Sequence, residues 1–377
     1  MVISIVIFIF TLLVLVLIHE LGHFLVAKRF NIKVLEFGFG IPPRAWSKKL
    51  GETLISLNWL PFGGFVRLLG EDETDKNILQ NPRSFAHQKV LKRISVVFAG
   101  VVMNLVLAWI LFYVVLAAYG FKTQFPLITP HKFSAVTQTN ENLIMVADVV
   151  DNSPAQAAGI SIGERIVTIG DGFVGSSEEL QEKIKQNAGK VIKLTLSDPK
   201  SENLRVVELT PRKDPPQGQG PLGVALAQIQ IANIQYNGFS AIFAGPIHSW
   251  NLVAYSGKVL GSLIGKSIES RNFAPVSQTV SGPVGITTLT HAILSESKRP
   301  LISYLDFIGL LSLNLAVFNL LPIPALDGGR LFFLLIEVIT KRKIHPGFER
   351  WVHTAGMAIL LTLMLLITIS DVRKLFQ

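Results

Sequence analysis

Four long apolar blocks dominate the pattern of hydrophobic and polar positions along the chain. They cover residues 1–27, 94–119, 305–321 and 355–369. The first two reach the roughly 20 apolar residues that a helix needs to cross a bilayer, and the other two are shorter but adjoin further apolar sequence. The pattern therefore predicts a polytopic α-helical membrane protein with four transmembrane helices.

The first block could alternatively be a signal peptide that is removed. It lacks a basic segment at its start, is longer than an ordinary signal-peptide core, and carries polar residues where a cleavage site would lie. We therefore expect a retained first helix.

The sequence between the first two blocks is rich in glycine and aromatic residues. Residues 52–57 alternate weakly between apolar and polar positions, which indicates a strand, and the glycines and prolines of residues 37–43 and 58–66 divide the region into hairpins. An ordinary cytoplasmic loop is one interpretation. The other is a membrane-associated β-hairpin region beside an active site, since non-helical backbone at membrane depth must be buried in protein or line a cavity.

Residues 125–225 have the pattern of a small soluble α/β domain. The expected helix follows a serine and carries acidic residues in its first turn. We expect this helix over residues 177–186 and strands over residues 143–150, 165–169, 191–196 and 204–209. Residues 153–169 resemble the SPAxxAGI…GDxIxxI pattern of PDZ domains in bacterial proteases, although Glu164 and Arg165 replace the commoner residues. An unrelated small domain is the alternative interpretation.

These patterns divide the chain into four expected regions. They are an N-terminal membrane core over 1–120, one inserted PDZ domain over 125–225, a membrane-surface region over 226–302 and a C-terminal membrane core over 303–377. Within the third region, residues 239–264 place apolar side chains at roughly helical spacing, which favours an amphipathic helix on the membrane surface.

The basic residues predict the orientation of these regions in the membrane. The chain carries 35 Lys and Arg against 26 Asp and Glu, and its mean hydropathy is +0.46. Basic residues concentrate between the first and second blocks and between the third and fourth, so both loops should be cytoplasmic and the N-terminus and the PDZ-like domain should lie outside. The net charge of +9 then reflects topology, and we expect no nucleic-acid partner. Because the chain has no cysteine, any metal site must use histidine and carboxylate ligands.

An HExxH motif lies in the first apolar block, formed by His19, Glu20 and His23. Histidines four residues apart on a helix point to the same side and can share a metal ion, and the glutamate can act as general base on a metal-bound water. Ionisable side chains at membrane depth are costly and usually functional. The alternative is a pair of histidines that only make hydrogen bonds inside the helix bundle.

A catalytic zinc ion normally has three protein ligands, so a third is needed. Asp327 follows two prolines and precedes paired glycines, in a segment that breaks the helix and lies on the expected side of the membrane. Asp306 should lie near the opposite side. Glu337 and His353 are on the expected side and stay possible.

The motifs together resemble the site-2 protease family of intramembrane zinc metalloproteases. The similarity rests on HExxH in the first helix, NxxPxPxLDGG over residues 319–329 and an outward PDZ insertion, and it covers nearly the whole chain. The bacterial branch that cleaves membrane-bound anti-sigma factors is the closest match. The resemblance implies a Zn²⁺ ion bound by His19, His23 and Asp327, with Glu20 as the catalytic carboxylate.

The resemblance also implies how a substrate is held. Asn319, Pro322 and Pro324 would accommodate an unwound substrate helix, and residues 37–66 would form a re-entrant β-loop that receives the substrate as an added strand. The chain departs from many relatives in having Gly100 followed by valine, where they have Gly-Pro ahead of the asparagine that is Asn104 here. The role of Asn104 is therefore left open, as is any filter built from two PDZ domains.

The expected function is hydrolysis of peptide bonds within the transmembrane segments of single-pass proteins, such as anti-sigma factors or remnant signal peptides. The expected partners are these substrates, the lipid bilayer, and a peptide or substrate ectodomain at the PDZ domain. The expected location is the bacterial inner membrane, with the active site near its cytoplasmic side. A non-catalytic scaffold or chaperone with a vestigial metal site is the rival, and the intact Glu20 argues against it. A metal transporter would need ligands repeated across several spans.

Overall fold

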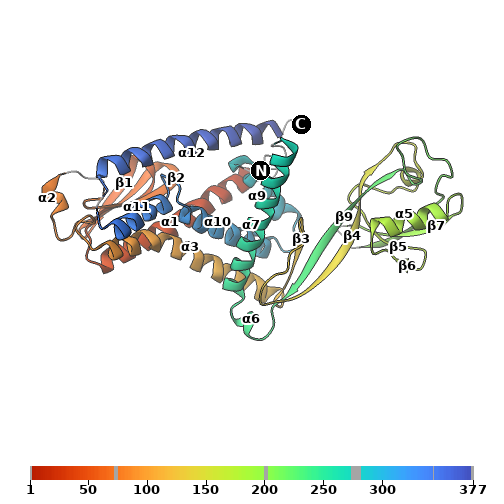
Figure 1. The fold of residues 1–377 in the computed structure, drawn as a ribbon, viewed down its shortest axis with the longest axis horizontal. Helices are drawn as coiled ribbons and strands as arrows, with labels where there is room; N and C mark the ends of the chain where they lie inside the picture. Colours follow the sequence, from red (N-terminus) through yellow and green to blue (C-terminus); the bar gives the residue numbers. More distant parts are fainter. Residues whose placement is uncertain (1, 72–74, 199–202, 273–281, 343, 375–377) are drawn as a thin grey trace. The chain divides into compact units, whose positions relative to one another are not determined.

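The computed structural model describes residues 2–71, 75–198, 203–272, 282–342 and 344–374 (Figure 1). The chain divides into two compact units. Unit 1 contains Met1–Ala118, Phe243–Val253 and Leu263–Gln377, and unit 2 contains Tyr119–Ile242 and Ala254–Ser262.

Long apolar helices build unit 1. They are α1 (Val2–Arg29), α3 (Val90–Ala118), α10 (Pro300–Leu320) and α12 (Pro346–Lys374). Each contains one of the four predicted apolar blocks, and four helices in the described part are long and apolar enough to cross a membrane. Helices α1 and α10 both pack against α3, so α3 is central to this bundle.

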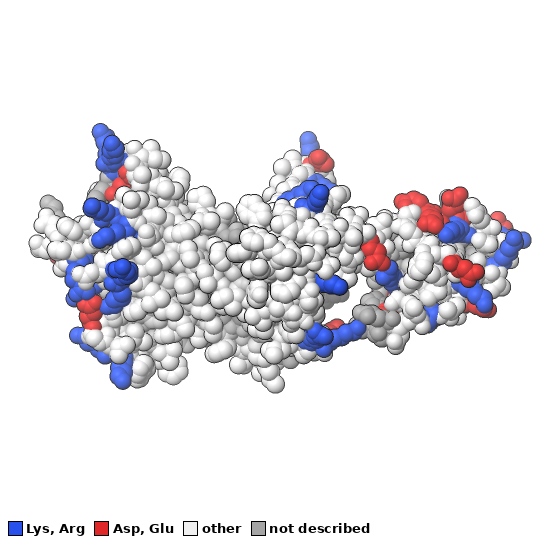
Figure 2. Space-filling model, turned by 90° about the horizontal axis from the view of Figure 1, so that it is seen from below, with Lys and Arg blue, Asp and Glu red and all other residues white. Residues whose placement is uncertain are grey.

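One face of the apolar helices of unit 1 is nearly without charged side chains. Figure 2 shows a broad surface over these helices that is nearly free of Lys, Arg, Asp and Glu. On this face, Lys and Arg gather at the end of unit 1 that carries α2 (Lys76–Leu79) and the hairpin of β1 (Val34–Leu50) and β2 (Thr53–Leu68). This is the distribution expected of a surface in contact with lipid chains.

The position of Asp327 differs from the expectation that it ends the third span. Helix α10 ends at Leu320, and Asp327 is the first residue of a separate helix, α11 (Asp327–Thr340). The intervening prolines lack the N–H groups that would continue α10. The glycines that follow Asp327 allow a tight turn, because a Cβ atom on Gly328 would collide with the carbonyl oxygen of Leu321.

Strands β1 (Val34–Leu50) and β2 (Thr53–Leu68) form a hairpin in this region, and β2 is longer than the strand expected over residues 52–57. Residues 36–39 pair with residues 64–67 and also with residues 54–57, so the hairpin folds back on itself. Residues 64–68 have no other strand partner within the described chain. This free edge lies against α1, because a Cβ atom on Gly64 would be 3.2 Å from Cγ of Glu20.

The remaining helices of unit 1 are α7 (Ala244–Ser270), which extends to residues assigned to unit 2, and α9 (Pro283–Glu296). Helix α7 contains most of the predicted amphipathic segment. Helix α9 packs against α1 and α10, and Asp371 of α12 accepts hydrogen bonds from the backbone N–H groups of Gly282 and Gly285 at its start.

Unit 2 is an antiparallel sheet with the strand order β3-β9-β4-β5-β7-β8, and β6 pairs with β5. The strands are β3 (Lys122–Leu127), β4 (Thr137–Val149), β5 (Arg165–Ile169), β6 (Gly172–Phe173), β7 (Ile192–Ser197), β8 (Leu204–Leu209) and β9 (Val224–Gln235). The helices of this unit are α4 (Pro154–Ala157), α5 (Ser177–Gln186) and α6 (Phe239–Ile242).

The predicted bounds of α5, β5 and β8 are confirmed. The hydroxyl of Ser176 accepts a hydrogen bond from the backbone N–H of Glu179, as a serine N-cap should. We expected the domain to end at residue 225, whereas β9 carries the sheet to Gln235 by pairing with both β3 and β4.

Glu164, one of the two departures from the PDZ pattern, has a structural role in unit 2. Its buried carboxylate accepts two hydrogen bonds from Arg205, at 2.8 and 2.7 Å, and one from the backbone N–H of Ser161. The hydrogen bonds from Arg205 hold the pKa of Glu164 below its usual range. The pair joins the start of β5 to β8 at the far edge of the sheet.

We predict that Glu164→Gln loosens β5 and β8 at pH 7, because the hydrogen bonds from Arg205 to the buried side chain at position 164 lose their charged acceptor. Hydrogen exchange of the β5 and β8 amides in the purified full-length protein should be about tenfold faster, corresponding to about 1.4 kcal/mol. A carboxylate whose pKa is lower in the folded than in the unfolded protein stabilises the fold fully at a pH above its pKa in the unfolded protein. This stabilisation is lost as the pH falls through its pKa in the folded protein. The difference between the two proteins should therefore persist down to pH 5 and shrink below about pH 4. Equal exchange at pH 7 would contradict the assignment.

Candidate metal centre

His19, His23 and Asp327 lie together, although Asp327 follows His23 by 304 positions in the sequence. The two histidines occupy consecutive turns of α1, and their Nε2 atoms are 3.2 Å apart. Oδ2 of Asp327 lies 2.8 Å from Nε2 of His19 and 3.2 Å from Nε2 of His23. The first turn of α11 therefore presents a carboxylate to the HExxH face of α1.

The geometry of these three side chains fits a zinc ion. Zinc is bound by histidine nitrogen and carboxylate oxygen at about 2.0–2.2 Å in a tetrahedral arrangement, which places ligand atoms about 3.3 Å from one another. The three separations here are 2.8, 3.2 and 3.2 Å. The donor set also leaves a fourth position for water or substrate, as in other catalytic zinc sites.

A backbone carbonyl orients His23. Its Nδ1 atom lies 2.8 Å from the carbonyl oxygen of Val96, which can only accept a hydrogen bond. Nδ1 must therefore carry the proton, and Nε2 directs a lone pair toward the metal position. Partners of this kind fix the tautomer and ring orientation of metal-binding histidines.

Asn104 of α3 is buried beside the other histidine of the motif, His19. Its Nδ2 atom lies 3.4 Å from Nδ1 of His19, and its Oδ1 atom has no hydrogen-bond partner among the described residues. With the side-chain amide turned by 180°, Oδ1 would accept the proton of Nδ1, and Nε2 of His19 would be left to bind metal. The residue whose role the sequence left open thus contacts a histidine of the motif.

Two glycines allow α1 and α3 to approach closely at this point. A Cβ atom on Gly22 would collide with the carbonyl of Ala99 in α3. A Cβ atom on Gly100 would lie 2.5 Å from Nε2 of His23 and 2.7 Å from Nε2 of His19. Any side chain at position 100 would occupy the space of the imidazoles. Sequence reasoning noticed Gly100 only for the missing proline and did not assign it to the site.

Glu20 lines a cavity of about 400 Å³, and His23 and Asp327 also belong to its wall. The free edge of β2 forms another wall, through residues 65–68. A carboxylate in such a cavity can accept a proton from water and return it to a leaving group. The arrangement thus places a general base beside a metal position and an exposed backbone edge.

The other candidate ligands lie outside the group. Glu337 forms an ion pair with Arg93 of α3. Nδ1 of His353 accepts a hydrogen bond from the backbone N–H of Ala325 at 2.9 Å. Asp306 is on α10 and does not belong to the metal-binding group formed by the described residues.

The three residues expected to hold substrate occupy the connection from α10 to α11. Asn319 is in the last turn of α10, and Pro322 is exposed after it. Pro324 lies against α12, where it leaves no room for a side chain at position 356. None of the three lines the cavity that contains Glu20.

Comparison with known proteins agrees with this geometry. Residues 7–363 match the description "Peptidase family M50". The chain belongs to peptidase family M50. This is the site-2 protease family, and the protein is accordingly a multi-pass membrane zinc metalloprotease.

Similar proteins extend over almost the whole chain. A protein of Clostridium acetobutylicum named "Putative zinc metalloprotease" is 34% identical over 359 residues, covering 95% of this chain and 94% of the relative. Zinc metalloprotease RasP of Bacillus licheniformis is 26% identical over 440 residues, covering 96% and 97%. Among solved structures, the PDZ domain of an SdrC-like protein from Listeria monocytogenes is 18% identical with a TM-score of 0.20, covering 26% of this chain and 94% of that one.

We predict that Gly100→Ala lowers zinc content about tenfold, because the methyl group displaces the imidazoles. Proteolytic activity should fall by the same factor. Alanine favours a helix over glycine, so α3 itself should not be weakened. Zinc bound per purified protein, measured by mass spectrometry in a zinc-buffered solution, checks this. The matched control is Gly261→Ala on α7, where an added Cβ meets nothing within 4 Å. Equal zinc in the two variants would refute the steric argument.

Proposed function

We propose that the protein is an intramembrane protease that hydrolyses peptide bonds within the transmembrane segments of single-pass substrates. The observation that carries the proposal is the place of the metal centre. His19 and His23 lie on α1, a helix that is long and apolar enough to cross a membrane, and the distant Asp327 meets them there. Membrane-bound anti-sigma factors and remnant signal peptides are the substrate classes that we propose.

We assign the metal-binding role to His19, His23 and Asp327, with Asn104 holding the orientation of His19. When bound, zinc polarises the peptide carbonyl and makes its water a better nucleophile. Glu20 takes the proton of the attacking water and transfers it to the leaving amine. The cavity wall keeps the scissile bond beside this carboxylate.

The substrate must be unwound before it is cut, because a helical peptide bond is shielded within the helix. Unwinding at membrane depth would leave backbone N–H and C=O groups without partners, which is costly in lipid. The edge of β2 over residues 64–68 supports a solution, since an extended peptide can add to it as a strand beside Glu20. We assign Asn319, Pro322 and Pro324, in the broken connection ahead of Asp327, to accommodating the unwound segment.

We further assign a PDZ fold to unit 2, as an inserted domain that holds or screens the outer part of the substrate. Helix α5 and strand β9 flank a cavity of about 660 Å³, which suits an extended peptide. The basic residues at the β1–β2 end of unit 1 favour a cytoplasmic location for that end, in the bacterial inner membrane. The N-terminus and unit 2 would then lie outside the cytoplasm.

We predict that Glu20→Gln lowers kcat about 10²- to 10⁴-fold while zinc content is unchanged, because only the proton-transfer group is lost. Cleavage of a single-pass reference substrate reconstituted in lipid vesicles, together with zinc analysis, measures both effects. Glu182→Gln on the outer domain is the matched control and should cleave normally. Equal cleavage by Glu20→Gln and the wild type would overturn the protease mechanism.

Asp327→Ala should lose at least about tenfold in zinc affinity, since two histidines alone make an incomplete site. Zinc competition with a chelator of known affinity provides the measurement. Activity should fall in parallel and recover partly when zinc is supplied in excess. Zinc binding as tight as in the wild type would exclude Asp327 as a ligand.

A further inference from the structure

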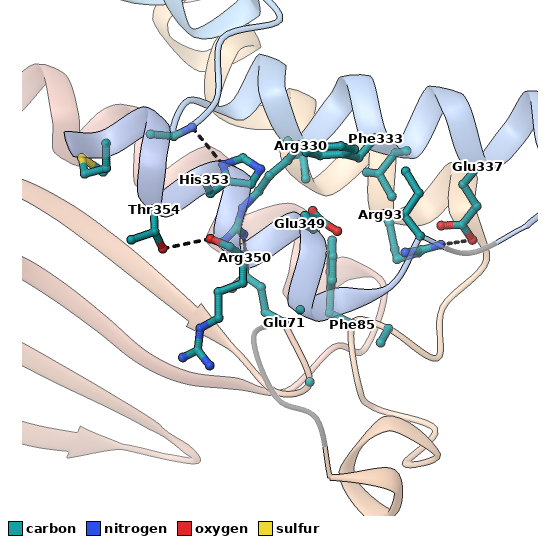
Figure 3. A pocket seen from close by; sticks show the side chains of 18 of the residues that line it. Glu71, Phe85, Arg93, Arg330, Phe333, Glu337, Glu349, Arg350, His353 and Thr354 are labelled. Carbon is teal, nitrogen blue, oxygen red and sulfur yellow. Dashed lines mark hydrogen bonds and ion pairs between the residues drawn. The ribbon is translucent and has the colours of Figure 1, made fainter. Parts of the chain in front are cut away.

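A second and larger cavity of about 690 Å³ adjoins the cavity that contains Glu20 (Figure 3). We call it the side cavity. Its walls come from α3, α11, the first half of α12 and the segment after β2. The two cavities share the lining residues Glu71, Phe85, Val97, Ala325 and Arg330. We call the cavity that contains Glu20 the catalytic cavity. A peptide chain that occupies it can therefore continue into the side cavity.

The free edge of β2 leads from one cavity to the other. Residues 65–68 line the catalytic cavity, and Gly70 and Glu71 line the side cavity. Glu71 fixes this path, because its carboxylate accepts a hydrogen bond from the backbone N–H of Leu68 and forms an ion pair with Arg330 of α11. Strand β2 and the residues after it therefore run from the wall of the one cavity to the wall of the other.

The charges around the side cavity are balanced. Three arginines and three glutamates line it, namely Arg93, Arg330, Arg350, Glu71, Glu337 and Glu349. Two ion pairs, Arg93–Glu337 and Arg330–Glu71, account for four of them. A site for an anionic lipid headgroup would carry an excess of cations. A cavity without net charge is suited to a neutral polypeptide chain, whose side chains the apolar walls could receive.

Two hydrogen-bond donors in the walls have no partner among the described residues. They are Nε2 of His353 and Nε of Arg93, and both are buried. Nδ1 of His353 accepts from a backbone N–H, so Nε2 carries the proton, and the arginine Nε is always a donor. A buried donor without a partner costs about 1–3 kcal/mol, and both need acceptors. Because both atoms are covered, an entering chain must displace wall side chains to reach them, and Figure 3 shows the Arg330 side chain beside the His353 ring.

We propose that the side cavity is a substrate subsite that receives the unwound residues on one side of the cleaved bond. Their carbonyl oxygens accept hydrogen bonds from the His353 and Arg93 donors, and the Arg330–Glu71 pair stands at the passage between the cavities. The proposal rests on strand addition at β2 under the proposed function. The side cavity would be a second binding region for the same substrate, next to the residues that follow the C-terminal end of β2.

Photo-crosslinking tests occupancy directly. A benzoyl-phenylalanine residue is placed at Ala358, which lines the side cavity, or at the neighbouring Ile359, which is 68% exposed and does not line it. Both proteins carry Glu20→Gln and are reconstituted in lipid vesicles with the single-pass reference substrate. The probe at Ala358 should capture substrate residues on one side of the cleaved bond only. The probe at Ile359 should capture lipid.

The proposal is overturned if the probe at Ala358 captures only lipid, or the same substrate residues as the probe at Ile359. Because cross-linking requires binding without cleavage, this result is independent of the protease assignment. If the wild type cleaves and Glu20→Gln does not, the proposed function stands whatever the cross-links show.

Filling the cavity provides a second test in the active protein. Ala358→Phe should raise KM for the reference substrate about tenfold with little change in kcat or zinc content, because it removes binding outside the reacting bond. Ile359→Phe is the matched control and should leave both constants as in the wild type. Unchanged KM in Ala358→Phe, with its zinc content intact, would contradict the subsite.

Discussion

The close crossing of α1 and α3 is the constraint on which the site depends. Both histidines of the motif point toward α3, and the helices can approach only because Gly22 and Gly100 lack side chains at the crossing. That approach also brings the carbonyl of Val96 and the amide of Asn104 to the outer nitrogens of the two rings. One steric feature thus sets the spacing of the two imidazoles and brings a partner on α3 to the outer nitrogen of each ring.

The sequence predicted the parts of the site that local geometry determines. His19, Glu20 and His23 follow from helical periodicity, and Asp327 from the broken segment around it together with the family resemblance. Asn104 and Gly100 act only across a helix–helix contact, which spacing along one sequence does not show. Helix α11 was not predicted because its apolar stretch is too short to cross a membrane. The turn ahead of it depends on how Gly328 packs against the end of α10 and Gly329 against the connection that follows.

Long-range pairing explains the remaining differences in the sheets. Weak alternation indicated a strand over residues 52–57, but the full β2 strand extends to Leu68 because β1 pairs with two of its segments. Likewise β9 could not be assigned from its own residues, since it pairs with β3 and β4, whose residues lie 75 to 113 positions earlier in the chain. The ends of α5, β5 and β8, in contrast, are set by local turn and cap residues, and these were predicted.

Chemistry on a transmembrane peptide imposes a second constraint, because every hydrogen bond broken by unwinding must be replaced inside the protein. A strand edge satisfies only alternate residues on one side of the added peptide. The residues beyond that edge need other donors, and the walls after β2 contain two, on His353 and Arg93. The arginines that line the side cavity are balanced by an equal number of glutamates. The cavity can therefore accept a neutral main chain without attracting anionic headgroups. Both the strand edge and the balanced charges of the side cavity therefore meet the same requirement, which is to provide hydrogen-bond partners for an unwound, neutral main chain inside the protein.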